Sequence, residues 1–146
     1  MMNPSLKKKK ILIVDEELDM QIFLSRVLES GGYEAMIAGD GGAGLRMAIE
    51  DQPALVIVDL MMTGQAGIQL LHELRNTEAL KDIPVVTLSR IDHETFSQYQ
   101  TLAGVPAGGA TIEPERYLEK PPEAEELLRL LHRLTEAEGA RESKNA

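Results

Sequence analysis

Four short apolar runs along the chain each lead into a polar side chain. The polar positions are Asp15 with its neighbour Glu16, then Asp59, Ser89 and finally Lys120. Carboxylates are the hard oxygen ligands that Mg²⁺ prefers, while a lysine and a hydroxyl group can bind the oxygens of a phosphoryl group. An aspartate can also act as a nucleophile and form an acyl phosphate. These residue types indicate phosphoryl chemistry, provided that the fold brings the four positions together.

The apolar runs themselves are typical of strands that are buried on both faces of a parallel sheet. We expect strands at Ile11–Val14, Tyr33–Ala38, Leu55–Val58, Pro84–Leu88 and Tyr117–Leu118. A parallel sheet binds its ligands beyond the carboxyl ends of its strands, at the point where the strand order reverses. The polar positions all follow such ends, so one edge of the sheet is the expected site.

Apolar residues at helical spacing lie between the expected strands. The residues that show this spacing and mark the helices include Leu24 and Leu28, Leu45 with Ala48 and Ile49, Leu70 and Leu74, Phe96 and Tyr99, and Leu127 and Leu131. Five strands alternating with five helices predict an α/β fold, with a doubly wound parallel sheet covered by helices on both faces.

The acidic residues at the expected site repel one another unless a cation lies between them. Two unit charges 4 Å apart repel by about 4 kcal/mol at an effective dielectric constant near 20. If the first and third strands are neighbours, Asp15, Glu16 and Asp59 share one pocket and favour a bound divalent cation. Lys120 adds an ammonium group that can pair with Asp59 when no phosphoryl group is present.

The composition limits the partners of the chain. A net charge of −9, with only three Tyr, two Phe and no Trp, argues against a nucleic-acid surface. Cysteine is absent, which excludes thiolate chemistry and fits a reducing compartment. No apolar run approaches the roughly 20 residues of a membrane span. We therefore expect a cytoplasmic protein that binds neither nucleic acid nor membranes.

Four stretches of the chain together resemble the receiver domain of two-component response regulators. They are KKILIVDEE at 9–17, PALVIVDLMMTG at 53–64, IPVVTLS at 83–89 and YLEKP at 117–121. The resemblance implies a flavodoxin-like sheet with strand order 2-1-3-4-5. We expect one receiver domain over residues 9–135, with flexible segments at 1–8 and 136–146 and no attached output domain.

The resemblance implies that Asp59 accepts a phosphoryl group from a sensor histidine kinase or a phosphotransfer protein. It also implies a Mg²⁺ site, with the ligands Asp15, Glu16, Asp59 and the backbone carbonyl of Met61. The domain would relay its signal by contact with a downstream protein, as a monomer or weak homodimer. Turnover of a free substrate is not implied, so we do not expect an enzyme.

Three further positions take roles from the same resemblance. Ser89 and Lys120 would bind the phosphoryl oxygens and report the arrival of the group. Tyr117 corresponds to an aromatic residue that changes its side-chain conformation during this switch. The bond between Lys120 and Pro121 is often cis in such domains.

The sequence departs from the family pattern at several positions. Glu16 stands where an aspartate is usual, and Arg90 follows Ser89 where a small residue is usual. Arg90 can clamp a phosphate or an acid, or it can screen the site. Thr63 replaces a usual proline, and residues Gly104–Arg116 lengthen the connection to Lys120. These departures leave open a degenerate receiver that acts as a docking module without phosphorylation.

A glycine motif supports a different function. Gly39, Gly41 and Gly44 fit the spacing G-x-G-x-x-G after an expected strand, as in dinucleotide-binding domains. This alternative leaves Asp15, Ser89 and Lys120 without a role, and the motif falls in the second strand–helix unit. We regard dinucleotide binding as the weaker hypothesis.

Overall fold

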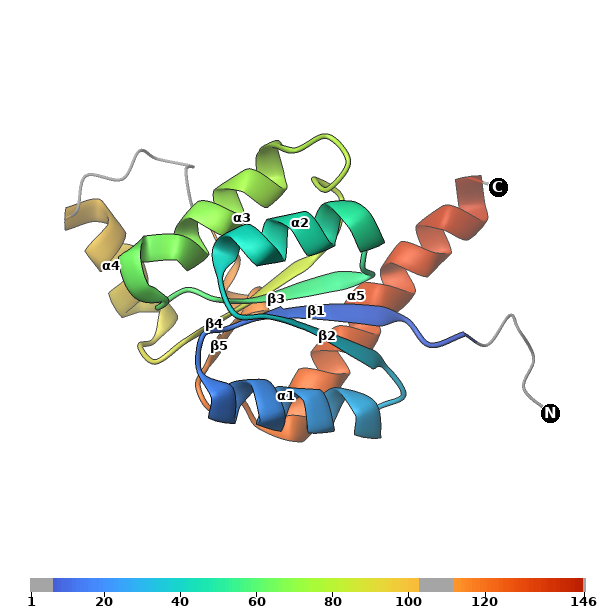
Figure 1. Cartoon of the computed structure of the whole chain (residues 1–146), viewed down its shortest axis with the longest axis horizontal. Helices are drawn as coiled ribbons and strands as arrows, with labels where there is room; N and C mark the ends of the chain where they lie inside the picture. Colours follow the sequence, from blue (N-terminus) through green and yellow to red (C-terminus); the bar gives the residue numbers. More distant parts are fainter. Residues whose placement is uncertain (1–6, 103–111, 146) are drawn as a thin grey trace.

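The computed structural model describes residues 7–102 and 112–145, and its described strands form one parallel sheet (Figure 1). The strands are β1 Lys10–Val14, β2 Glu34–Ala38, β3 Leu55–Asp59, β4 Val85–Ser89 and β5 Tyr117–Glu119. Their order is β2-β1-β3-β4-β5, with every neighbouring pair parallel. The doubly wound, flavodoxin-like sheet predicted from the sequence is therefore confirmed.

Helices alternate with the strands along the chain. They are α1 Leu18–Ser30, α2 Gly41–Asp51, α3 Ala66–Asn76, α4 His93–Leu102 and α5 Ala124–Asn145. In Figure 1, α1 and α5 lie on one side of the sheet and α2 and α3 on the other, with α4 beyond one end of the strands. In the part of the chain that the structure describes, no helix is both long and apolar enough to cross a bilayer.

The two faces of the sheet carry separate cores because successive strand residues point to opposite sides. In β1, Ile11 and Ile13 pack in the core beneath α1 and α5, whereas Leu12 and Val14 pack in the core beneath α2 and α3. All four side chains are fully buried. Such a strand, buried on both faces, is held firmly in register, and so is the polar residue that follows it.

Two glycines allow helices to approach the strands closely. A Cβ atom at Gly44 of α2 would lie 2.9 Å from Val14, and one at Gly67 of α3 would lie 2.0 Å from the carbonyl oxygen of Asp59. Gly44 thus takes an inner position, while Ile49, one of the apolar residues that mark this helix in the sequence, is 48% exposed. The helix was predicted correctly, and its inner face is formed by Gly44 and Ala48.

The glycine motif has a structural explanation. The side chain of Asp40 accepts a hydrogen bond of 2.8 Å from the backbone N–H of Ala43 and caps the start of α2. Gly44 is needed for packing against Val14. The cap and the close packing account for Asp40 and Gly44 of the motif without a bound nucleotide.

Two expectations concern the connection before β5 and the two ends of the chain. Residues 104–111 of the lengthened connection lie outside the described residues, and its last part forms a short 3-10 helix at Pro114–Arg116. The backbone of α5 is helical to Asn145, past the point where a tail was expected. The flexibility of the segments 1–8 and 136–146 stays a prediction.

Substitution of Gly67 tests the close approach of α3 to β3. Gly67→Ala should lower the free energy of unfolding by about 2–3 kcal/mol, because the new methyl group meets backbone atoms that cannot turn away. The measurement is urea unfolding followed by circular dichroism. Gly42→Ala in α2 is the matched control, since its Cβ would meet no atom closer than 3.4 Å. It should be neutral or stabilising by up to about 1 kcal/mol, and equal effects of the two substitutions would contradict the packing argument.

Candidate functional site

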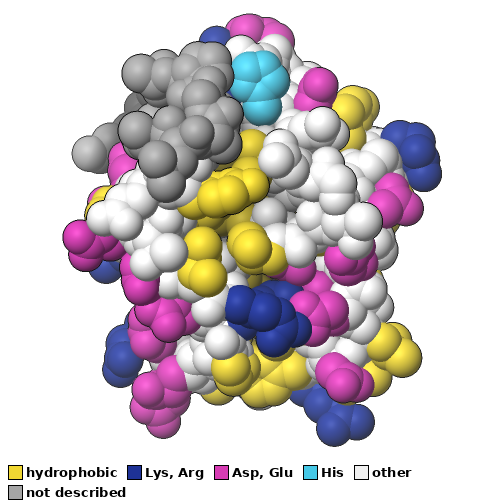
Figure 2. Space-filling view, turned by 90° about the vertical axis from the view of Figure 1, so that its left-hand side faces the viewer, with side chains coloured by type: hydrophobic (Ala, Val, Ile, Leu, Met, Phe, Trp, Pro, Cys, Tyr) yellow, Lys and Arg dark blue, Asp and Glu magenta, His cyan; other side chains and the backbone are white. Residues whose placement is uncertain are grey.

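The predicted polar positions gather at one end of the sheet, where the strands terminate. Asp15 follows β1, Asp59 and Ser89 end β3 and β4, and Lys120 follows β5. The backbone N–H of Lys120 donates to the carbonyl oxygen of Ser89 at 2.8 Å, which ties the end of β5 to that of β4. Figure 2 looks onto this end of the molecule and shows basic and acidic side chains meeting near its middle.

Lys120 forms the centre of the site. Its Nζ atom lies 2.8 Å from Oδ2 of Asp15, 3.0 Å from Oδ2 of Asp59 and 3.1 Å from Oε1 of Glu17. The side chains of Lys120, Asp15 and Asp59 are almost completely buried. One ammonium group therefore neutralises part of a cluster of three carboxylates.

Burial and pairing compete in setting the charges of the site. Burial raises the pKa of Asp15, and its contact with Lys120 offsets this only in part. Burial lowers the pKa of Lys120, but its contacts with the carboxylates of Asp15 and Asp59 outweigh burial and raise it. The lysine thus stays charged, while the ionised form of Asp15 is disfavoured by its surroundings.

Two tight turns of the same kind aim the carboxylates. Oδ1 of Asp15 accepts a hydrogen bond from the backbone N–H of Glu17, and Oδ1 of Asp59 accepts one from the N–H of Met61, both at 2.9 Å. An aspartate that bonds the backbone two residues on folds the chain into a turn. Each aspartate thereby fixes one oxygen on its own loop and leaves Oδ2 facing Lys120.

The turn after Asp15 separates the two glutamates that follow it. Oε1 of Glu16 accepts hydrogen bonds of 3.0 Å from the backbone N–H and the hydroxyl group of Thr63, on the loop after β3. The side chain of Glu17, two residues beyond Asp15, points into the site and contacts Lys120. The carboxylates brought within 4.8 Å of one another are Asp15, Glu17 and Asp59, so the expectation that Glu16 would complete the cluster is corrected. Direct ligation of a metal by Glu16 stays a prediction.

Glu17 was missed from the sequence, although a signal for it existed. An aspartate at the end of a strand favours a turn closed by the residue two positions later, which is Glu17. Its second oxygen, Oε2, accepts a hydrogen bond from the guanidinium group of Arg90. The hydrogen bonds with Arg90 and then with Lys120 lower the pKa of Glu17. Arg90 thus pairs with an acid, one of the roles considered for it.

Ser89 and Tyr117 are connected through one residue. The fully buried Ser89 accepts, on Oγ, a hydrogen bond of 3.2 Å from the backbone N–H of Ile91, and the hydroxyl group of Tyr117 donates to the carbonyl oxygen of Ile91 at 2.6 Å. Tyr117 is buried and packs edge-on against His93, with ring centroids 5.1 Å apart. The Lys120–Pro121 bond is cis, as the resemblance implied.

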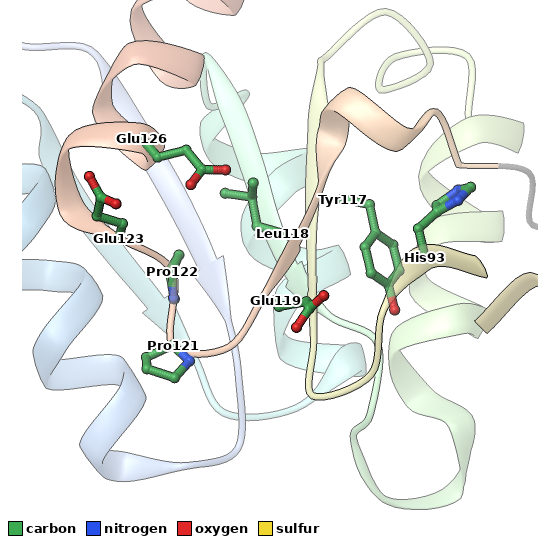
Figure 3. Close-up of a pocket in the computed structure, with 8 residues that line it drawn as sticks. All are labelled: His93, Tyr117, Leu118, Glu119, Pro121, Pro122, Glu123 and Glu126. Carbon is green, nitrogen blue, oxygen red and sulfur yellow. The ribbon is translucent and has the colours of Figure 1, made fainter. Parts of the chain in front are cut away.

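A pocket of about 430 Å³ lies beside Tyr117, between the start of α4, β5 and the start of α5 (Figure 3). The eight lining residues are His93, Tyr117, Leu118, Glu119, Pro121, Pro122, Glu123 and Glu126. Three of the eight are acidic and several are apolar. The pocket therefore joins the buried aromatic ring to an acidic surface.

The donor set fits a divalent cation. The cluster offers carboxylate oxygens, which Mg²⁺ prefers, and it carries one more negative charge than Lys120 and Arg90 together neutralise. Oδ2 of Asp15 is buried and, within the described residues, lacks a hydrogen bond of good geometry; its contact is the ion pair with Lys120. The residues present thus suit a small, hard cation beside Asp59.

A flavodoxin-like sheet with a buried lysine among carboxylates at its carboxyl end defines the class of receiver-like signalling domains. The family model described as "Response regulator receiver domain" matches residues 11–132. The chain therefore belongs to the response regulator receiver domain family of two-component signalling proteins.

The relatives agree with this assignment. The chain is 35% identical over 138 residues to "Response regulator MprA" of Mycolicibacterium vanbaalenii, a match that covers 92% of this chain and 55% of that protein. It thus spans about half the length of such relatives. Among solved structures, chemotaxis protein CheY4 of Vibrio cholerae is 26% identical with a TM-score of 0.71, covering 88% of this chain and 99% of that one. A putative response regulator of Chloroflexus aurantiacus is 28% identical, with a TM-score of 0.71 and coverages of 88% and 98%.

Substitution of Asp15 tests the free-energy cost of burying its ionised carboxylate. Because the pKa of Asp15 is raised in the fold, its stabilising contribution is present below its unfolded value and is lost as the pH rises through the folded value. In the absence of metal, Asp15→Asn should therefore raise the free energy of unfolding by about 1 kcal/mol at pH 7. The difference from wild type should shrink as the pH falls toward 4.

Urea unfolding at several pH values measures this difference. Asp82→Asn, at an exposed loop position, is the matched control and should change stability by less than about 0.5 kcal/mol. A loss of stability in Asp15→Asn at pH 7 would show that the ionised carboxylate contributes more through Lys120 than burial takes away.

Proposed function

We propose that the chain is a phosphoryl-accepting receiver that takes a phosphoryl group on Asp59 from the histidine of a sensor kinase or a phosphotransfer protein. The observation that supports this most directly is the contact of Lys120 with Oδ2 of Asp59, at 3.0 Å in a buried site. A lysine so placed can contact an oxygen of a phosphoryl group that becomes bonded to this carboxylate.

The proposed reaction moves a phosphoryl group from a nitrogen of the donor histidine to an oxygen of Asp59. An oxygen of Asp59 bonds to phosphorus, the bond from phosphorus to the donor nitrogen breaks, and its electron pair leaves with the donor. Lys120 then exchanges a carboxylate partner for a phosphoryl oxygen, and the hydroxyl of Ser89 donates to another oxygen. These groups stabilise charge that spreads over the equatorial oxygens.

The acidic residues supply the place for a cation in this proposal. Asp15, Glu17 and Asp59 would hold Mg²⁺, and Glu16 and the backbone carbonyl of Met61 remain the ligands implied by the family resemblance. When bound, the ion would offset the negative charge that the carboxylates and the phosphoryl group share.

The signal would leave the site through Ile91. If the hydroxyl of Ser89 turns to a phosphoryl oxygen, its contact with the N–H of Ile91 is lost, and Tyr117 is bonded to the carbonyl of the same residue. Tyr117 borders the pocket between α4, β5 and α5 (Figure 3). We propose that a downstream protein in the cytoplasm reads this surface by direct contact.

Phosphorylation of Asp59 can be measured directly. Incubation with Mg²⁺ and a small phosphodonor should add the mass of one phosphoryl group to the intact protein, because the donor needs no kinase when the site itself assists the transfer. The gain should be absent in Asp59→Asn and strongly reduced when a chelator removes the metal. Asp82→Asn should gain the group as wild type does.

The same measurement separates this function from a docking module. If wild type gains no mass with any small donor or with a phosphorylated histidine phosphotransfer domain, the proposal is overturned in favour of a receiver that acts without phosphorylation. A gain that persists in Asp59→Asn would place the acceptor elsewhere in the chain.

A further inference from the structure

We propose that Arg90 and Glu17 form an electrostatic latch across the mouth of the site, which opposes the binding of a divalent cation. The latch rests on the proposed function, because the cation it resists is the one that serves Asp59. It is a regulatory contact of this chain: Arg90 lies where receiver domains usually carry a small residue.

The contact joins two loops that are 73 residues apart. Glu17 lies between β1 and α1, and Arg90 follows Ser89 at the end of β4. The two oxygens of Glu17 are divided between two cations: Oε1 contacts Lys120 at 3.1 Å, and Oε2 accepts the hydrogen bond from Arg90. Each oxygen of Glu17 thus faces a cation, so a metal that binds Glu17 competes with Lys120 or Arg90 for the carboxylate.

The two cations hold Glu17 differently. The side chain of Lys120 is 1% exposed and is fixed by two buried aspartates, whereas that of Arg90 is 61% exposed. An exposed ion pair is weak and is screened by salt. Arg90 is therefore the side of the contact that can open, and its strength sets how readily Glu17 becomes available.

Charge balance points in the same direction. Three carboxylates face Lys120 and Arg90, which leaves one net negative charge at the site. Without Arg90 the site would carry two net negative charges and would attract a divalent cation more strongly. The guanidinium group thus opposes the cation both by holding Glu17 and by its own charge.

Calorimetric titration of Mg²⁺ into the full chain at low ionic strength measures the latch. Arg90→Ala should bind Mg²⁺ about three- to fivefold more tightly than wild type, the range of an exposed ion pair. The gain should disappear near 1 M NaCl, where the Debye length is about 3 Å. Arg129→Ala, which removes an exposed arginine of α5 and changes the net charge equally, should leave the affinity unchanged.

A double-mutant cycle separates the ion pair from the charge alone. If the latch operates through Glu17, Arg90→Ala should change the Mg²⁺ affinity by less than about twofold in a Glu17→Gln background. An Arg90→Ala gain of the same size in both backgrounds overturns the latch, as does an Arg90→Ala variant that binds like Arg129→Ala. If neither wild type nor Arg90→Ala binds Mg²⁺, the proposed function fails together with the latch. If wild type binds Mg²⁺ and is phosphorylated, a negative result bears on the latch alone.

Discussion

The site depends on a buried lysine that faces more negative charge than it can neutralise. Lys120 lies within 3.1 Å of oxygens from Asp15, Glu17 and Asp59, of which the first two follow β1 and the third ends β3. Removing Lys120 would leave two buried aspartates without their cation, and such uncompensated buried charge is far more costly than a broken exposed pair. The ends of β1, β3 and β5 are therefore held together by electrostatics as well as by the sheet.

The scaffold makes this arrangement possible by fixing the strand ends from both sides. Every residue of β3 is buried, and the register with β4 places Asp59 opposite Leu88. Gly67 lets α3 rest on the carbonyl oxygen of Asp59 itself, so the backbone of Asp59 is held between helix and sheet. The side chain of Asp59 is thus carried by a backbone that has little room to move.

The fold and four of the site positions could be predicted because they follow from local patterns. A continuous apolar run such as Leu55–Val58 marks a buried strand, and a parallel sheet necessarily collects the residues after such strands at one edge. Which of the two glutamates faces Lys120 could not be predicted in the same way. Glu16 and Glu17 are adjacent and identical in type, and only the turn closed by Asp15 decides which one faces Lys120. Likewise, the sequence offered several partners for Arg90, and the choice of Glu17 depends on two loops that meet only in the folded chain.

Incomplete neutralisation also makes the site favourable for a bound cation. A cluster whose charges were fully balanced by fixed partners would gain little from a cation, whereas one net negative charge leaves a free-energy gain for cation binding. Under the proposed function, the response would leave the site by a physical contact. Ser89 and Tyr117 bond to the N–H and the carbonyl oxygen of the same residue, Ile91, so a new partner for the serine alters the segment that holds the tyrosine hydroxyl. The strand ends and the packing beside α4 are therefore linked by hydrogen bonds to one residue of backbone.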